Sequence, residues 1–280
     1  MKNDSIEIKK FNGEIETFNA EKLKTSLRRS KASESEIDEI VEQIMPTLYD
    51  GMPSKEIYKK AFSLLKKHNR TSASKYSLKR AILDLGPTGY PFEQLVSALL
   101  KHHGYSTQVG IIMQGECITH EVDVLAEKDG NTYTVECKFH ADPKAVSNVK
   151  VPLYINSRFL DIQKCWNNDS KKASHLKQGW LVTNTRFSTD AIDYAKCVGL
   201  HLLSWDYPKN NGIKQNVDKF VLYPITTLTT LTKNEKHLLI KYNVILTKEL
   251  YKDSHLLDKI GISTLRKEKV LNEIKKLCDL

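Results

Sequence analysis

The sequence predicts a multi-domain α/β protein with three parts: a small N-terminal domain, a central mixed sheet flanked by helices, and a C-terminal helical region. Three observations carry this prediction. Two short β patterns surround Asp129-Gly130, a strand–helix–strand pattern spans 179–205, and apolar residues recur at helical spacing on either side. A hairpin pairs strands antiparallel and a strand–helix–strand unit pairs them parallel, so we expect a mixed sheet. The expected domains are 1–86, 87–208 and 209–280.

Charge is unevenly distributed over these parts. The 280 residues carry a formal net charge of +9, which favours a polyanionic partner. Residues 1–86 carry +4, residues 87–208 carry −1 and residues 209–280 carry +6. The central part is therefore flanked by basic ends, an arrangement suited to an enzyme that acts on phosphodiesters.

The cysteines and the hydropathy indicate a protein of the cytoplasm. The five cysteines lack the spacing of a metal site, and their odd number favours reduced thiols. No segment resembles a signal peptide, and no apolar run reaches the roughly 18 residues of a membrane span. We therefore expect no membrane association.

The N-terminal part begins with a hairpin pattern over 6–18 that turns at Asn12-Gly13. Asn19 is expected to cap a first helix. A second helix is expected over about 34–48, a third capped by Ser54, and a fourth over about 72–85, and Gly51-Met52-Pro53 is expected to interrupt the helices.

The run I-K-K-F-N-G-E-I-E-T-F-N-A-E-K-L resembles the ATP-cone, a nucleotide-sensing regulatory domain, and the likeness extends over about residues 5–86. The resemblance implies a site for ATP or dATP. Its lining residues would be Ile8, Lys10, Glu16, Asn19 and Lys22, with Ser54, Tyr58 and Arg80 facing the phosphates or the base. Phe11 stands where the family usually has a second basic residue, so phosphate contact is weaker or comes from Lys9. The alternative is a small basic structural domain.

A helix is expected over 91–103, ended by Gly104, and a strand over 107–113. The hairpin that follows has unusual charges. A two-residue turn at Asp129-Gly130 pairs positions whose numbers sum to 259, which puts Asp123 opposite Glu136 and Glu121 opposite Lys138. Like charges at opposite positions destabilise a sheet, and a bound Mg²⁺ would resolve the conflict. The alternative is a solvated charged face.

Asp123, followed thirteen positions later by Glu136-Cys137-Lys138, resembles the D…(E/Q)xK signature of the PD-(D/E)xK nucleases, and most of all their Mrr-like restriction endonuclease branch. The resemblance implies a restriction-endonuclease-like sheet. Mg²⁺ or Mn²⁺ would be held by Asp123, Glu136 and the Cys137 carbonyl, while Lys138 would activate the attacking water. The thiol of Cys137 should point into the core.

The same resemblance implies two helical site residues. Glu93 would join the metal shell, and Gln163, on a helix expected over about 154–166, would face the site. Without the resemblance, Glu93 favours the helix dipole and Gln163 faces solvent. The segment L-V-T-N-T-R-F-S-T-D-A-I-D-Y-A-K-C-V-G-L-H-L-L also resembles the Mrr-like branch, and Arg186 within it could meet a DNA phosphate.

The C-terminal part is helical and basic, with a capping box at Thr232 and Glu235. Four of its lysines could bind phosphates: Lys267, Lys269, Lys275 and Lys276. Oligomerisation or packing is the alternative role for this region.

These features predict a metal-dependent endonuclease of the restriction or defence type. Its substrate would be DNA, with RNA still open, and adenine nucleotide would regulate it within a homo-oligomer, a dimer or tetramer. The alternative is a nucleotide-responsive DNA-binding regulator with a non-catalytic nuclease-like domain. The ATP-cone repressors of that kind carry paired CxxC motifs, which this sequence lacks.

Overall fold

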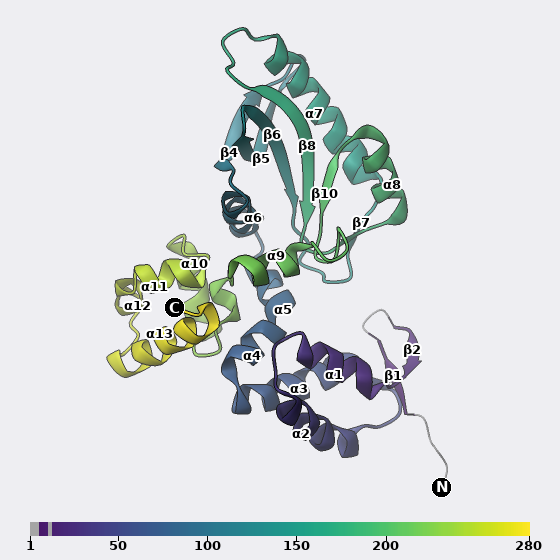
Figure 1. Cartoon of the computed structure of the whole chain (residues 1–280), viewed down its shortest axis with the longest axis vertical. Coiled ribbons are helices and arrows are strands. Elements are labelled where there is room, and N and C mark those ends of the chain that lie inside the picture. Colours follow the sequence, from purple (N-terminus) through teal and green to yellow (C-terminus); the bar gives the residue numbers. More distant parts are fainter. Residues whose placement is uncertain (1–5, 11–12) are drawn as a thin grey trace.

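The computed structural model describes residues 6–10 and 13–280. Figure 1 shows the three parts: the N-terminal domain, the central sheet between helices, and the C-terminal helices beside them. The predicted fold class is therefore confirmed.

The N-terminal domain combines a three-stranded sheet with short helices. Its strands have the order β2-β1-β3, with β1 (Glu7–Lys9), β2 (Ile15–Thr17) and β3 (Met52–Pro53). Its helices are α1 (Ala20–Arg28), α2 (Glu34–Ile44), α3 (Ser54–His68), α4 (Arg70–Tyr76) and α5 (Leu78–Leu83), with a 3₁₀ turn at Met45–Thr47. The apolar stripes of these helices meet in one core that includes Leu27, Ile37, Ile40 and Leu65.

Three local details differ from expectation. The β1–β2 register pairs Lys9 with Ile15, so the turn is longer than a two-residue turn at Asn12-Gly13, of which Asn12 lies outside the described residues. The segment 51–53, which was expected only to interrupt the helices, contains strand β3, because Met52 pairs in parallel with Ile8. The expected fourth helix is two helices, α4 and α5, interrupted at Ser77.

The central sheet has the strand order β10-β8-β6-β5-β4. Its strands are β4 (Ser106–Gln114), β5 (Thr119–Lys128), β6 (Asn131–Lys138), β8 (His175–Thr183) and β10 (His201–Leu203). β4, β5 and β6 pair antiparallel, whereas β6, β8 and β10 pair parallel. The mixed sheet and the parallel strand–helix–strand unit are thus confirmed. β7 (Val146–Ser147) and β9 (Arg186–Phe187) form a separate small pair.

Helices cover both faces of this sheet (Figure 1). α6 (Tyr90–His102) lies on one face, and α7 (Lys150–Asn168) and α8 (Thr189–Val198) lie on the other. α7 begins earlier than expected, because Pro152 sits in its first turn, where a missing N–H has no cost. Ser188 caps α8, and Gly199 ends it with a φ of 75°, as the sequence indicated.

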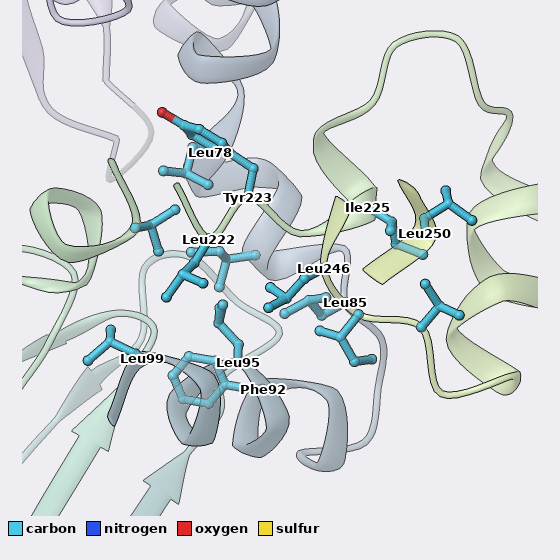
Figure 2. Close-up of a cluster of buried hydrophobic side chains, with 14 of the residues drawn as sticks. Leu78, Leu85, Phe92, Leu95, Leu99, Leu222, Tyr223, Ile225, Leu246 and Leu250 are labelled. Atoms are coloured by element: carbon cyan, nitrogen blue, oxygen red, sulfur yellow. The ribbon is translucent and has the colours of Figure 1, made fainter. Parts of the chain in front are cut away.

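The C-terminal part consists of α9 (Ile213–Phe220), α10 (Lys233–Lys241), α11 (Thr247–Lys252), α12 (His255–Lys259) and α13 (Thr264–Cys278), with a 3₁₀ turn at Ile225–Thr227. The capping box at Thr232 and Glu235 is present. The region is not a detached tail. Figure 2 shows Leu222, Ile225 and Leu246 packing with Leu85 of the segment after α5 and with Phe92 of α6. One continuous core therefore joins α5, α6 and the C-terminal helices, and the boundary at 208 stays a prediction.

Within the described part of the chain, no helix combines the length and the apolarity that a transmembrane span requires.

Candidate active site

The candidate site lies on the β5–β6 hairpin, at the end remote from its turn. Asp129 and Gly130 have φ angles of 50° and 71°, which a type I′ turn requires. The pairs run from Lys128 with Asn131 to Val124 with Val135, the register expected from a two-residue turn. One step further along this register, Asp123 meets the strand segment that carries Glu136 and Cys137.

Asp123 bonds directly to the neighbouring strand. Its Oδ2 atom accepts the backbone N–H of Cys137 at 2.6 Å. On β4, Val109 pairs with Val124 and Ile111 with Val122, and Gly110 between them has a φ of 67°, in the left-handed region. Burial raises the pKa of the Asp123 carboxyl, and the Cys137 N–H opposes that rise. Asp123 therefore has an oxygen fixed against the backbone of the strand that carries the rest of the signature.

Glu136 is buried, with 8% of its surface exposed, and it has a cationic partner. Nη1 of Arg158, from α7, donates to its Oε2 at 2.7 Å, and Nη2 of the same guanidinium donates to the Glu121 carbonyl. Burial, and then the charge of Asp123, raise the pKa of Glu136 to about 7 despite this ion pair.

Arg158 is the site residue that the sequence reasoning missed. It lies three residues after Ile155 and four before Ile162, both of which are buried on α7. A basic residue on the apolar stripe of a helix was the available signal, since such a side chain needs a buried partner.

Glu93 lies in the first turn of α6, close enough to the other carboxylates for their charges to affect its ionisation. Burial, followed by the charges of Asp123 and Glu121, raises its pKa to about 7. A Cβ on Gly89 would lie 3.1 Å from Glu93 Oε1, so the glycine leaves room for this carboxylate. The charge of Asp123 therefore opposes the ionisation of both Glu93 and Glu136, and pKa values perturbed in this way are common at functional sites.

The carboxylate oxygens of these residues are of the type that binds a hard divalent cation, but the three carboxylates are not close together. Mg²⁺ takes carboxylate and carbonyl oxygens and commonly keeps several waters, so one or two protein carboxylates are sufficient. The three carboxylates do not form a compact three-ligand cluster. Binding of a metal ion by Asp123, Glu136 and the carbonyl of Cys137 therefore stays a prediction.

Within residues 6–10 and 13–280, one set of three side chains does have ligand atoms within 4.8 Å of one another: Glu116, Cys117 and Asp161. Its acids already have partners. Lys164 Nζ lies 2.6 Å from Glu116, and Asp161 accepts the Cys117 N–H at 2.9 Å and contacts His120 Nε2 at 2.7 Å. This set fastens the turn between β4 and β5.

Lys138 and Cys137 occupy the end of β6. Lys138 is exposed, and its carbonyl accepts the Thr183 hydroxyl at 2.8 Å. Its positive charge favours ionised Asp123. The Cys137 side chain packs in the core on the α6 side, where burial raises the thiol pKa well above its usual value, so the expected core position is confirmed. A metal-binding role for its carbonyl stays a prediction.

The structure does not bring Gln163 to the carboxylates. Its Nε2 donates to the carbonyl of Leu176 at 2.9 Å. Leu176 precedes Leu181, the partner of Glu136, by five residues on β8, or about 16 Å at the usual strand rise. Gln163 therefore fastens α7 to the start of β8, because the packing of α7 directs it toward that end of the sheet.

The residues assigned to the nucleotide site cluster in part. Glu16 lies between two lysines, 3.0 Å from Lys10 Nζ and 2.9 Å from Lys22 Nζ. Asn19 caps α1 by accepting the N–H groups of Glu21 and Lys22. The two lysines and the start of α1 thus form one basic edge.

The remaining residues of this set lie on β1, α3 and α5. Ile8 is buried in the core of the domain and Lys9 is exposed. Ser54 is the first residue of α3 and not its cap as expected, because Pro53 occupies the N-cap position. The Tyr58 ring stacks on Tyr76 with centroids 5.0 Å apart. Arg80 pairs with Asp84 at 2.9 Å. Phe11 lies outside the described residues.

Comparison with known proteins identifies both ends of the chain. Residues 6–84 match the family described as the ATP cone domain, which implies adenine-nucleotide binding. Residues 223–278 match the family described as AF1548-like, C-terminal.

Individual relatives agree with this assignment. An uncharacterized protein of Archaeoglobus fulgidus is 36% identical over 183 residues, which cover 65% of this chain and 99% of that protein. A solved structure of AF1548, a protein of unknown function, is 35% identical with a TM-score of 0.56, covering 69% of this chain and 99% of that one. MspJI restriction endonuclease, solved with a 27-mer oligonucleotide, is only weakly similar, at 13% identity and a TM-score of 0.36 over 72% of this chain and 39% of that one, and supports no inference. The chain, with an ATP-cone domain at its N-terminus, belongs to the AF1548-like family.

Proposed function

We propose that this protein is a metal-dependent endonuclease of the Mrr-like PD-(D/E)xK type, which hydrolyses DNA phosphodiester bonds in restriction or defence under control of adenine nucleotide. The observation that best supports this proposal is the contact of Asp123 with the strand segment Glu136-Cys137, near Glu93. Burial raises the pKa of all three carboxyls, and the charge of Asp123 raises those of Glu93 and Glu136 further. Such a cluster is stabilised by a hard divalent cation and suits phosphodiester chemistry.

Each residue has a role in this proposal. Asp123, Glu136 and the Cys137 carbonyl hold Mg²⁺ or Mn²⁺, which supplies Lewis-acid stabilisation of the charge that develops on the phosphate. The Lys138 ammonium, at the exposed end of β6, orients the attacking water and stabilises negative charge on the phosphate oxygens. Glu93 adds a third carboxylate from helix α6.

Regulation would pass from the ATP-cone to the site through packed elements. Leu78 and Leu85 share a core with Phe92, which precedes Glu93 on α6 (Figure 2). ATP or dATP can shift this packing, or the homo-oligomeric state, only if it binds one state more tightly than the other.

The Arg158–Glu136 ion pair favours a second candidate function. An arginine that already neutralises Glu136 is what a nuclease-like domain without catalytic metal would contain. In that case the protein would be a nucleotide-responsive DNA-binding regulator.

One experiment separates the two functions. The purified protein is incubated with supercoiled plasmid, modified phage DNA and RNA, with Mg²⁺ or with EDTA, and with or without ATP or dATP. Nicking or linearisation that needs Mg²⁺ and changes with nucleotide supports the nuclease. DNA binding without cleavage under every condition would reject it in favour of the regulator.

A further inference from the structure

A groove of about 750 Å³ lies between the ATP-cone and the C-terminal helix α13. Its cationic lining comes from both sides. Lys66, Lys67 and Arg70 belong to the end of α3 and the start of α4, whereas Lys269 and Lys276 belong to α13. About 200 residues separate the two groups in sequence, so only the tertiary structure forms this surface.

These five cations lack acidic partners. Among residues 6–10 and 13–280, none of them has a carboxylate oxygen within 4.0 Å. The acid in the lining, Glu273, is buried, and neutral groups engage it: the Ser74 hydroxyl at 3.0 Å and the N–H groups of Thr229 and Thr230 at 2.7 and 2.9 Å. Five cations and one carboxylate line the groove, so it keeps an excess of positive charge, as expected of a surface that binds an anion.

The groove is distinct from the proposed nucleotide site. Ser54 begins α3 and Lys66 to His68 end it, so the two places lie about 20 Å apart along this 15-residue helix. No Phe, Tyr or Trp lines the groove in the described part of the chain, so nothing there offers a stacking platform for an adenine ring.

The cations are spaced for a chain of phosphates. Lys269 and Lys276 are seven residues apart on α13, which is two helical turns and about 10.5 Å. At a rise of about 3.4 Å per nucleotide on one strand, this distance corresponds to about three nucleotide steps.

We propose that the sugar-phosphate backbone of a nucleic acid docks in this groove, held between α3–α4 of the ATP-cone and α13. Since the cone supplies half of the surface, nucleotide binding to the cone can change how the nucleic acid is held. The inference rests on the proposed function for its nucleic-acid partner, but it needs neither the carboxylates nor hydrolysis. Lys267, paired with Asp258 at 2.6 Å, takes no part.

The test measures binding of the full chain to a fluorescent duplex of about 20 base pairs by anisotropy, in EDTA, over a range of NaCl concentrations. Two groove variants reverse charge on either side: Lys269→Glu/Lys276→Glu and Lys66→Glu/Arg70→Glu. Each should weaken binding about tenfold or more and reduce the salt slope by about 1.8, two contacts at about 0.9 each. The matched control is Lys241→Glu/Lys252→Glu, which makes the same charge change at exposed lysines outside the groove and should keep the slope.

Each outcome of this test either supports or overturns the proposal. An unchanged slope in either groove variant overturns the proposal, and loss in the α13 variant alone would assign binding to that helix and not to the groove. Weakened binding of inorganic tripolyphosphate with intact duplex binding would make the groove a small-polyphosphate site and also overturn it. Thermal melting checks that the variants fold. Because EDTA prevents metal-dependent cleavage, the binding result can be interpreted even if the nuclease proposal fails.

Discussion

The guanidinium of Arg158 donates to the Glu136 carboxylate at 2.7 Å, so the most buried acid of the candidate site already has a cation beside it. Under the proposed function, a divalent ion would compete with this arginine for the Glu136 carboxylate. The strength of the ion pair therefore decides how the site responds to metal.

Arg158→Gln should lower the free energy of unfolding by about 3 kcal/mol at pH 8, because it leaves Glu136 buried without a counter-charge. Saturating Mg²⁺ should recover much of this loss. Urea unfolding with and without Mg²⁺ measures both effects. The matched control is Lys164→Gln on the same helix, whose pair with Glu116 is exposed and worth about 0.5 kcal/mol or less. Equal losses in the two variants would contradict a buried pair.

Asp123→Ala and Lys138→Ala should each reduce Mg²⁺-dependent cleavage by about a hundredfold or more, since one removes a metal ligand and the other a charge at the phosphate. DNA affinity should change little. A plasmid-nicking assay alongside anisotropy separates the two properties. Glu116→Ala removes an acid of the neighbouring cluster and should cleave normally. If both variants still cut DNA, the chemistry lies elsewhere in the chain.

The stabilising effect of Mg²⁺ should grow with pH. The pKa values of Glu93 and Glu136 are about 7, above the usual 4.5, so the folded state binds more protons than the unfolded state between about pH 4.5 and pH 7. These two groups therefore lower stability as pH rises through that window. Mg²⁺ competes with the same protons.

Thermal melting from about pH 5 to about pH 8, with and without Mg²⁺, measures this effect. Glu93→Gln cannot ionise, so it should melt higher than the wild type near pH 8 without metal and gain less from Mg²⁺. A metal effect that does not depend on pH would count against these carboxylates as the ligands.

Lys22→Ala should weaken ATP binding about tenfold, because it removes a charge-assisted contact to phosphate at the basic edge of the ATP-cone. Isothermal titration calorimetry gives the affinity. Lys24→Ala is the matched control, since Lys24 is on the same helix and also pairs with an acid, but its partner is Asp38 of α2 at 2.6 Å, whereas Lys22 pairs with Glu16 of the proposed nucleotide site. Identical ATP affinity in the Lys22 variant and the wild type would remove Lys22 from the nucleotide site.

By itself, the sequence determined the features that depend on neighbouring residues. Asp129-Gly130 defines a two-residue turn, the turn defines the register, and the register brings Asp123 to the segment of Glu136. The caps at Asn19, Ser188 and Thr232 follow from the same local chemistry. The sequence therefore predicted the register from Val124 with Val135 to Lys128 with Asn131, and Asp123 contacts the backbone of Cys137 just beyond it.

Only the tertiary structure decided the contacts between elements distant in sequence. Helical periodicity shows which stripe of α7 is buried but not how far the helix slides along the sheet, and that position brings Arg158 to Glu136 and takes Gln163 to Leu176. In the same way, the groove exists only because α13 packs against α4. That packing includes the hydrogen bond from Ser74 to Glu273, which joins residues 199 positions apart in the sequence. The physical reason is that turn and cap energies depend on a few adjacent residues, whereas docking of helices depends on the shape and charge of whole surfaces.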